Sequence, residues 1–478
     1  MQFVLEKGGE AKVLPVGEKG SVSEEYKELF NFLKDRKLFS GKNGETYTSL
    51  SHNENGIIFV GLGDEDKIDS QSIRKAFHSL GKEAEKNKFK SIGMSLPVYK
   101  TQNYSNTIKA VVEGLIQSQY GFNKYKSGDK PETVLSTVYI EVPEEEKQSA
   151  TDAIDEISIL MEGVFLTRNL VNEPAIEMYP EVLAKSAVDS LSPVGVEVTV
   201  WGREKIEEMG MTAFLAVSKG SEKEPQFIIM KYMGNPDSEE KLALVGKGLT
   251  YDSGGYCLKP ADSMATMHTD MAGAASVIGA MYSIAKSGLK KNVIAIVAAC
   301  ENMISGGAYK TGDIIGSMSG KTIEIGNTDA EGRVTLADAL WYTATVEKAD
   351  KIVDLATLTG ACIVALGNVN TGAIANDDDL MEMVSAASKI AGEPVWELPH
   401  NEEYVELNKS DFADIKNTGG RGAGTITAGL FLREFVNDTP WVHLDIAGTS
   451  HLTSPMGYLP KGATGVPVKT LYYLVKDI

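Results

Sequence analysis

The sequence predicts an α/β protein with two domains: a smaller N-terminal α/β domain and a larger C-terminal α/β domain whose central sheet is mainly parallel and covered by helices. Three observations lead to this prediction. The chain has 478 residues, which is too long for a single compact core. Strand-like and helix-like stretches alternate along it, which is typical of parallel sheets with crossover helices. The later strand candidates are continuous apolar runs, as expected of strands that are buried on both faces.

The first third of the chain carries the alternating pattern of the smaller domain. Apolar runs bounded by glycine or proline mark its strands, and amphipathic stretches between them mark its helices. In chain order, we expect a strand at 55–63, a helix at 70–88, a strand at 91–98, a helix at 105–119 and a strand at 136–143.

A long helical pattern separates this part of the chain from the rest. It runs from about Ala150 to Leu170 and ends at the proline-containing break NEP, residues 172–174. The expected domain limits are residues 1–148 for the N-terminal domain, 149–172 for the connecting helix and 173–478 for the C-terminal domain.

The C-terminal part repeats the pattern with longer loops between its elements. Small residues in a helical stretch at 271–288 suit close packing against a neighbour. Because ligands of open α/β sheets bind where strands end and helices begin, we expect functional residues at such junctions. Strands are expected at 241–248, 292–300, 351–360 and 441–448, and a further helix at 333–349.

Charge and cysteine content exclude several classes of protein. The net charge is -19, so the surface offers no general attraction for phosphates, and nucleic acid is not expected as a partner. Cys257, Cys300 and Cys362 form no CxxC pair, and their odd number argues against a disulfide framework. The start of the chain lacks the pattern of a secretory signal, and the most apolar run, Val293–Cys300, is too short to cross a bilayer. We therefore expect a cytoplasmic protein with no membrane partner.

Three tempting motifs fail on closer reading. Asp252-Ser253-Gly254-Gly255 is similar to the nucleophile loop of trypsin-like proteases, but the usual preceding glycine is absent and the surrounding pattern is βα. The segment GSMSGKT at 316–322 is one residue short of a phosphate-binding loop, and a strand-like stretch follows it. The six histidines form no HExxH pair; His268, near the candidate carboxylates, is expected to pack or orient rather than to bind a metal.

Seven charged residues stand at the strand–helix junctions of the C-terminal part. Taken singly, each could be a helix cap or a surface charge. Together, the four carboxylates would repel one another unless two divalent cations neutralised them, and such paired ions activate water in two-metal hydrolases. Two carboxylates one residue apart in an extended loop would project to the same side. Two of the basic residues would remain for an oxyanion or a bound anion. The seven are Lys247, Asp252, Lys259, Asp270, Asp329, Glu331 and Arg333, with the close pair at 329 and 331.

The motifs GKGLTYDSGGYCLKP, TDMAGAASVIGAM and NTDAEGRVTLADAL resemble those of the leucine aminopeptidase (cytosol aminopeptidase) family of two-metal exopeptidases. ATLTGACIVALG, DFADIKNTGGRGAGTITAGLFL and HLDIAG extend the resemblance over roughly residues 160–478, and NTDAEGR is its most specific element. The resemblance implies that the C-terminal domain is catalytic. It also implies a metal-dependent aminopeptidase, a hydrolase of peptides that uses a water activated by two metals to remove the N-terminal residue, with a leucine-like preference.

The resemblance implies a role for each charged residue. Asp252 and Glu331 look like bridging ligands of both metals, Lys247 and Asp270 would complete the tighter site, and Asp329 would complete the more exchangeable one. Lys259 would stabilise the oxyanion, and Arg333 would hold a bicarbonate that acts as general base. The resemblance also implies residues that line the pocket for the first substrate side chain: Met267, Asn327, Thr357, Leu358, Gly360 and Ala447.

The implied cofactors are two divalent metal ions per subunit, Zn²⁺ or Mn²⁺, with bicarbonate as bound anion and base. The implied partners are peptides with a free N-terminus, because one metal would bind the substrate amine, and copies of the same chain in a homohexamer. Alternative functions are a two-metal phosphoesterase, which would want more basic groups than the pocket offers, and a DNA-binding accessory protein, which the charge of -19 opposes. A non-catalytic scaffold would not need the intact ligand set.

Overall fold

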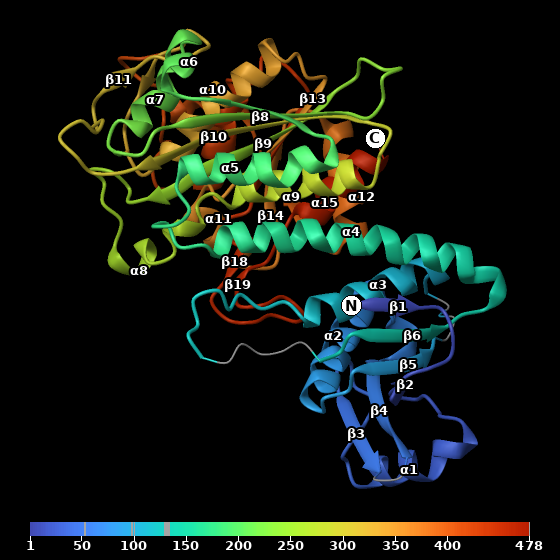
Figure 1. The fold of residues 1–478 in the computed structure, drawn as a ribbon. Helices are drawn as coiled ribbons and strands as arrows, with labels where there is room; N and C mark the ends of the chain where they lie inside the picture. Colours follow the sequence, from blue (N-terminus) through green and yellow to red (C-terminus); the bar gives the residue numbers. More distant parts are fainter. Residues whose placement is uncertain (52–53, 97–98, 100, 129–133, 478) are drawn as a thin grey trace. The chain divides into compact units, whose positions relative to one another are not determined.

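The computed structural model describes residues 1–51, 54–96, 99, 101–128 and 134–477, and these form two compact units. The first comprises Met1–Met161 with Pro455–Pro460, and the second comprises Glu162–Ser454 with Lys461–Ile478 (Figure 1). Each unit has its own sheet, so the predicted two-domain α/β fold is confirmed.

The first unit is a six-stranded sheet with helices. The strand order is β1-β6-β5-β2-β4-β3, and only the pair β3–β4 is antiparallel. Ring stacking of Phe30 on Phe59, at 6.0 Å between centroids, fills part of its core. The strands are β1 (Gln2–Val4), β2 (Ala11–Gly17), β3 (Thr46–Ser51), β4 (Glu54–Gly63), β5 (Ser91–Ser95) and β6 (Thr137–Glu141), and the helices are α1 (Glu24–Asp35), α2 (Ser70–Lys86) and α3 (Tyr104–Ser118).

All five elements predicted for this unit are present, within a few residues of the expected limits. The expected strand at 91–98 appears as β5 and ends at Ser95; residues 97 and 98 lie outside the described part of the chain. The helix α2 begins at a capping box. The Asp69 side chain accepts from the Ser72 amide, and the Asp69 amide donates to the Ser72 hydroxyl at 2.8 Å. The strands β1, β2 and β3 and the helix α1 had no counterpart among the predicted elements.

A 26-residue helix, α4 (Lys147–Asn172), contributes residues to both units. Its C-terminal half packs closely on α9 (Ala272–Lys286) of the second unit. Gly163 and Gly279 allow this approach, because a Cβ on either glycine would overlap the backbone of the other. The Thr167 hydroxyl donates to the Ala275 carbonyl at 3.0 Å across the same contact.

The second unit is built on an eight-stranded sheet with the order β15-β14-β17-β13-β9-β10-β8-β7. The four central strands, β17, β13, β9 and β10, run parallel, whereas β14 pairs antiparallel with β17 and both β8 and β7 pair antiparallel with their neighbours. The strands are β7 (Glu197–Trp201), β8 (Gln226–Met233), β9 (Leu242–Asp252), β10 (Asn292–Asn302), β13 (Lys351–Ala356), β14 (Thr371–Ala375), β15 (Val395–Glu397) and β17 (Trp441–Asp445).

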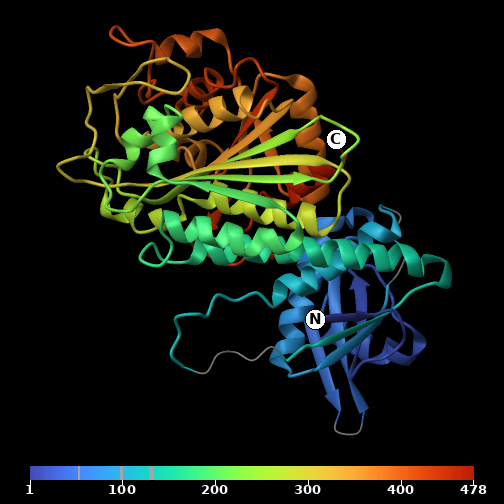
Figure 2. The same cartoon turned by 45° about the horizontal axis from the view of Figure 1, so that its top comes forward.

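Helices cover both faces of this sheet (Figure 2). The small residues of α9 permit close packing, as expected, since a Cβ on Gly246 of β9 would lie 2.7 Å from the Ala274 Cα. One layer holds α5 (Pro180–Leu191), α9, α12 (Asp378–Ala391) and α15 (Val468–Asp477), and the other holds α7 (Thr212–Ser218), α10 (Glu331–Thr345) and α14 (Gly424–Arg433).

Short elements complete the second unit. They include a three-stranded sheet of β11 (Ile314–Ile315), β12 (Ile323–Glu324) and β16 (Ile415–Lys416), a pair of β18 (His451–Leu452) and β19 (Gly462–Ala463), and the helices α6 (Arg203–Glu208), α8 (Ala261–Met264), α11 (Gly360–Leu366) and α13 (Glu402–Val405).

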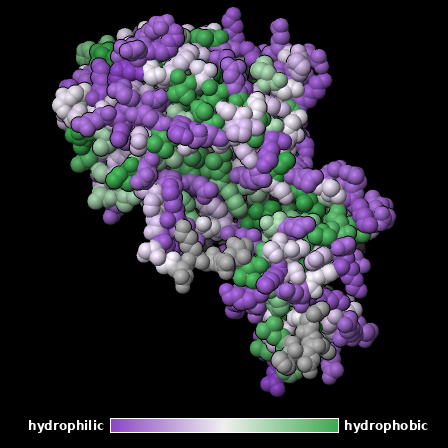
Figure 3. All heavy atoms as spheres, viewed as in Figure 1, coloured by the Kyte–Doolittle hydropathy of each residue, from purple (hydrophilic) through white to green (hydrophobic). Residues whose placement is uncertain are grey.

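Hydrophilic side chains dominate the face of the second unit that Figure 3 shows, in keeping with the high charge of the chain. Within the described part of the chain, no helix combines the length and the apolar character that a membrane span requires. All three cysteines are free, and Cys300 and Cys362 are buried.

Candidate metal and active site

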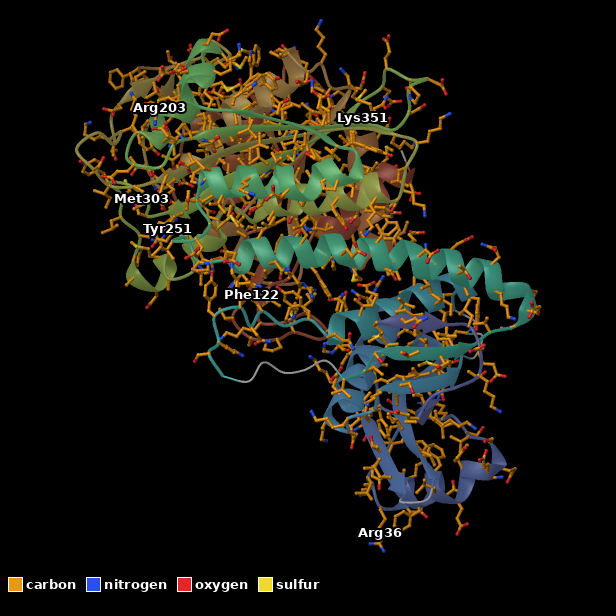
Figure 4. All side chains as sticks on the ribbon, viewed as in Figure 1. Arg36, Phe122, Arg203, Tyr251, Met303 and Lys351 are labelled. Atoms are coloured by element: carbon orange, nitrogen blue, oxygen red, sulfur yellow. The ribbon has the colours of Figure 1, made fainter. Side chains whose placement is uncertain are left out.

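The candidate site lies where the parallel strands of the second unit end. Tyr251 and Met303, labelled in Figure 4, stand at the carboxyl ends of β9 and β10, and Lys351 marks the amino end of β13, toward the other side of the sheet. Asp252 ends β9, and the loop that follows β13 begins at Thr357. The candidate site residues therefore gather at strand ends, as expected for an open α/β sheet.

The sequence predicted a strand that ends at 248, next to Lys247. In the structure β9 continues for five residues beyond Lys247, to Asp252. The reason is that its two neighbours end at different levels. β13 pairs with β9 only as far as Leu355 and Gly246, whereas β10 pairs with it up to Asn302 and Asp252. Lys247 therefore comes directly after the last residue of β9 that pairs with β13, and its Nζ reaches the Thr357 carbonyl just beyond β13.

The Lys247 ammonium is buried among carboxylates. Its Nζ lies 2.8 Å from Asp270 Oδ2 and 2.9 Å from Glu331 Oε1, and it donates to the Thr357 carbonyl at 3.2 Å. Burial alone would lower the pKa of Lys247, but the Asp270 and Glu331 carboxylates outweigh it and raise that pKa above its ordinary value. Gly332 makes room for the side chain, because a Cβ there would lie 2.6 Å from the Lys247 Nζ.

A second lysine lies between the other two carboxylates. Lys259 Nζ is 2.8 Å from Asp252 Oδ2 and 2.6 Å from Asp329 Oδ1. Burial opposes its charge, but these carboxylates raise the pKa of Lys259 above its ordinary value. The glycine loop that carries this lysine follows β9 closely: the Gly254 amide donates to Asp252 Oδ1 at 2.8 Å, and a Cβ on Gly254 would lie 2.8 Å from Asp329 Oδ1.

Asp252, Asp329 and Glu331 each offer one oxygen, and these three oxygens lie within 4.8 Å of one another. Glu331 Oε2 is buried and has no hydrogen-bond partner among the described residues. Desolvation raises the pKa of Asp252 and of Asp329, and it raises the pKa of Asp270 to about 7. With all of them ionised, four carboxylates against two lysines would leave two negative charges in a desolvated space, and the raised pKa values reflect this desolvation and repulsion. This donor set and its unsatisfied oxygen fit divalent cations.

One local prediction about these carboxylates is wrong. Glu331 does not lie in an extended loop beside Asp329; it is the first residue of α10, so the helix start rather than strand-like alternation turns it into the cluster. For Asp270, the alternative of a simple helix cap does not hold, because the N-cap of α9 is Met271. The Asp270 carboxylate instead accepts from the Thr357 hydroxyl at 2.7 Å and from the Lys247 ammonium at 2.9 Å, so it lies within the carboxylate cluster.

Arg333 lies on α10 and is buried at 7% exposure. Its Nη1 donates to the Asn417 carbonyl at 2.9 Å, and its Nε is buried with no hydrogen-bond partner among the described residues. Burial lowers the pKa of Arg333 to about 10, although Glu331 and Asp445 favour its charge. A buried guanidinium with an unused donor suits a small anion.

The structure brings two of the predicted pocket residues together through a carboxylate that the sequence analysis did not single out. Asp445 Oδ1 accepts from the amides of Leu358 at 3.2 Å and of Ala447 at 3.1 Å, and Asp445 Oδ2 accepts from the Thr359 hydroxyl at 2.6 Å. The buried Asp445 therefore joins the loop after β13 to the loop after β17.

The other pocket candidates have differing surroundings. The Thr357 hydroxyl donates to the Asp270 carboxylate, and Asn327 Oδ1 accepts from the Asp329 amide at 2.8 Å. Gly360 is exposed and has open space where a Cβ would stand, and Met267 is half-buried in the short helical turn Met267–Thr269.

Two sequence features that were set aside prove structural. His268 faces His451 edge to face, with 6.3 Å between ring centroids, and among the described residues it does not belong to the group of side chains close enough to hold a metal. The Ser253 hydroxyl donates to the Asn302 carbonyl at 2.8 Å, which ties the glycine loop to β10.

Sequence reasoning also missed two buried asparagines behind the carboxylates. Asn302 Nδ2 donates to Asp252 Oδ1 at 2.8 Å and to the Thr328 carbonyl at 3.0 Å. Asn417 accepts from the Gly326 amide at 2.8 Å and donates to the Asn327 carbonyl at 2.7 Å, in the loop that carries Asp329. Asn302 lies two residues after the predicted strand at 292–300, where functional residues were expected, whereas the sequence offers no such signal for Asn417.

The chain matches two family models. Residues 165–472 match the catalytic domain of the cytosol aminopeptidase family, and residues 4–129 match the N-terminal domain of the same family. A probable cytosol aminopeptidase of Clostridium tetani is 59% identical over 476 residues, which cover 100% of this chain and 99% of the relative. One from Treponema denticola is 50% identical over 450 residues, covering 93% of this chain and 94% of the relative.

Solved structures agree with these matches. A tomato leucine aminopeptidase mutant superimposes with a TM-score of 0.89 at 33% identity, over 100% of this chain and 97% of the other. The bottromycin maturation enzyme BotP in complex with Mn also gives a TM-score of 0.89, at 30% identity, over 98% and 99% of the two chains. The chain therefore belongs to the cytosol aminopeptidase family and is a metal-dependent aminopeptidase, a hydrolase of peptides.

Proposed function

We propose that Asp252 and Glu331 bridge two divalent cations, that Lys247 and Asp270 complete one site, and that Asp329 completes the other. The observation that carries this proposal is the cluster itself: three carboxylate oxygens within 4.8 Å of one another in a desolvated space with excess negative charge. Zn²⁺ and Mn²⁺ both suit oxygen ligands with one amine. When bound, such ions lower the pKa of water toward neutrality and polarise a carbonyl.

The difference in side-chain exposure supports Lys247 as the metal ligand and Lys259 as the catalytic residue. The Lys247 side chain is 3% exposed and is enclosed by Asp270 and Glu331, whereas the Lys259 side chain is 14% exposed. Cations on Asp252 and Asp329 would take over the neutralising role of Lys259. Its ammonium is then available to stabilise the oxyanion that forms at the scissile carbonyl.

Arg333 is the proposed binding residue for bicarbonate, because its buried guanidinium, whose charge Glu331 favours, has an Nε donor with no partner among the described residues. The bound anion would act as the general base. Met267, Asn327, Thr357, Leu358, Gly360 and Ala447 are proposed to line the pocket for the first substrate side chain, with a leucine-like preference.

We further propose a cytoplasmic homohexamer that acts on peptides with a free N-terminus. Exposed apolar side chains on and after α11 support an assembly, since Val364 is 91% and Val369 is 55% exposed. Sedimentation should give a particle mass near six times the chain mass of 51.5 kDa. A monomer with full activity would contradict the hexamer. The domain limits of 1–148, 149–172 and 173–478 belong to the same proposal.

The test is hydrolysis of leucine amide and N-acetyl-leucine amide by enzyme that has been stripped of metal and supplied with single ions. Activity should return with Zn²⁺ or Mn²⁺ and only on the substrate with a free amine. Comparable cleavage of the acetylated substrate would contradict the proposed recognition of the N-terminus, and full activity in a chelator would contradict the role of the cations.

A further inference from the structure

Asn417 is fully buried and follows directly after β16. Its side chain makes four hydrogen bonds with one loop. Oδ1 accepts from the amides of Gly326 at 2.8 Å and Asn327 at 3.2 Å. Nδ2 donates to the carbonyls of Asn327 at 2.7 Å and Ala330 at 3.3 Å. Amides cannot accept and carbonyls cannot donate, so these contacts require an asparagine amide in one orientation.

The loop held in this way carries Asp329 between Asn327 and Ala330. Asp329 is the most exposed of the four clustered carboxylates, with a side chain 33% exposed against 1–4% for the other three. Thr328 in the same loop donates to the Gly254 carbonyl at 2.7 Å, which ties the loop to the glycine loop on its other side. The position of Asp329 thus depends on how firmly its backbone is held.

Asn417 also reaches the second functional group. Its backbone carbonyl accepts from Arg333 Nη1 at 2.9 Å. One residue therefore contacts both the loop of Asp329 and the side chain of Arg333, although it lies 84 residues beyond Arg333 in the sequence.

We propose that Asn417 is a positioning residue, which sets Asp329 and Arg333 relative to each other and touches neither substrate nor cation. This role rests on the proposed assignment of Asp329 as a metal ligand. Residues that orient metal ligands typically change metal affinity or activity by about ten- to a hundredfold when replaced.

The test uses Asn417→Asp with a matched control. The change keeps the size of the side chain and its two accepting contacts, but it places a carboxylate oxygen where Nδ2 faced the two carbonyls. Asn292→Asp makes the same change at the amino end of β10, away from the site. Asn292 is 4% exposed, accepts from the Asn235 amide at 2.9 Å and donates to the Asn235 and Ser238 carbonyls at 3.0 and 2.7 Å.

Titration calorimetry of metal-free protein with Mn²⁺ gives the first readout. Asn417→Asp should weaken binding of one of the two ions by about ten- to a hundredfold. On leucine amide it should lower kcat by a similar factor with KM close to that of the wild type. Asn292→Asp should lower the melting temperature yet leave both readouts unchanged. If Asn417→Asp does not fold, Asn417→Ser, which removes the amide without adding charge, should show a smaller loss of the same kind.

The proposal is overturned if the folded Asn417 variant binds both ions as the wild type does, or if Asn292→Asp weakens them equally. Asp329→Ala in the same titration distinguishes a failure of the proposed metal ligand Asp329 from a failure of the positioning role of Asn417. Two ions retained at wild-type affinity in Asp329→Ala would refute the ligand assignment itself. Loss of one ion in Asp329→Ala but in neither Asn417 variant would refute only the positioning role.

Discussion

Replacing Gly332 by alanine tests the placement of Lys247. Gly332 is the second residue of α10, where alanine is ordinarily favoured over glycine by about 1 kcal/mol. A Cβ at this position would lie 2.6 Å from the Lys247 Nζ and 2.9 Å from its Cδ, closer than atoms approach without bonding. The lysine side chain must therefore move.

Movement of Lys247 separates its ammonium from Asp270 and Glu331, which it contacts at 2.8 and 2.9 Å. Breaking a buried ion pair costs about 3–5 kcal/mol. After the helix-propensity gain of about 1 kcal/mol is subtracted, we expect Gly332→Ala to destabilise the metal-free protein by about 2–4 kcal/mol. The variant should also bind fewer cations, because Lys247 is a proposed ligand.

Thermal unfolding followed by circular dichroism, elemental analysis of bound metal and hydrolysis of leucine amide measure these effects. Gly306→Ala is the control, since a Cβ at Gly306 meets open space and the change should alter stability by less than about 0.5 kcal/mol. Wild-type melting temperature, metal content and activity in Gly332→Ala would refute the described position of Lys247.

Three further predictions concern single side chains. Lys259→Ala should lower kcat by about a hundred- to a thousandfold while both ions stay bound, measured by kinetics and elemental analysis; parallel loss of metal would make Lys259 a ligand instead. Arg333→Ala should abolish any acceleration of hydrolysis by added bicarbonate, and an equal response in wild type and variant would contradict the proposed base. Burial raises the pKa of Asp338 to about 7, so the folded chain keeps a proton that the unfolded chain releases near pH 4. Stability should then fall by about 1.4 kcal/mol per unit as the pH rises between these values, and Asp338→Asn should flatten the melting temperature against pH; an unchanged slope would contradict this.

The sequence predicted the fold well where local patterns decide it. The apolar runs at 292–300 and 441–448 became β10 and β17, and the small residues of 271–288 became the closely packed α9. It could not show where β9 ends, because that depends on how far β10 accompanies it beyond the end of β13. It also missed the antiparallel strands β7 and β8 at the sheet edge, which are separated in the chain by the short helices α6 and α7.

The candidate site shows the same division. The charged residues at strand ends were identified from their types and spacing, and the structure brings Asp252, Asp329 and Glu331 together. Asn417 could not be identified as their support, because its contacts are with residues 87–91 positions away, and neither its type nor its spacing reveals them. Asp445 was hidden within an apolar strand, and only the packing of two loops reveals its role.

The most direct measurement of the central claim is the number of Mn²⁺ ions bound per chain, determined by elemental analysis after equilibrium dialysis of the wild type and Glu331→Gln. Glu331 is 1% exposed, and the substitution preserves its shape while removing the charge that two cations are proposed to share. The wild type should bind two ions per chain and the folded Glu331→Gln variant fewer, with loss of hydrolysis of leucine amide. Two ions per chain at the same affinity in both proteins would contradict the assignment of this carboxylate cluster as the metal site.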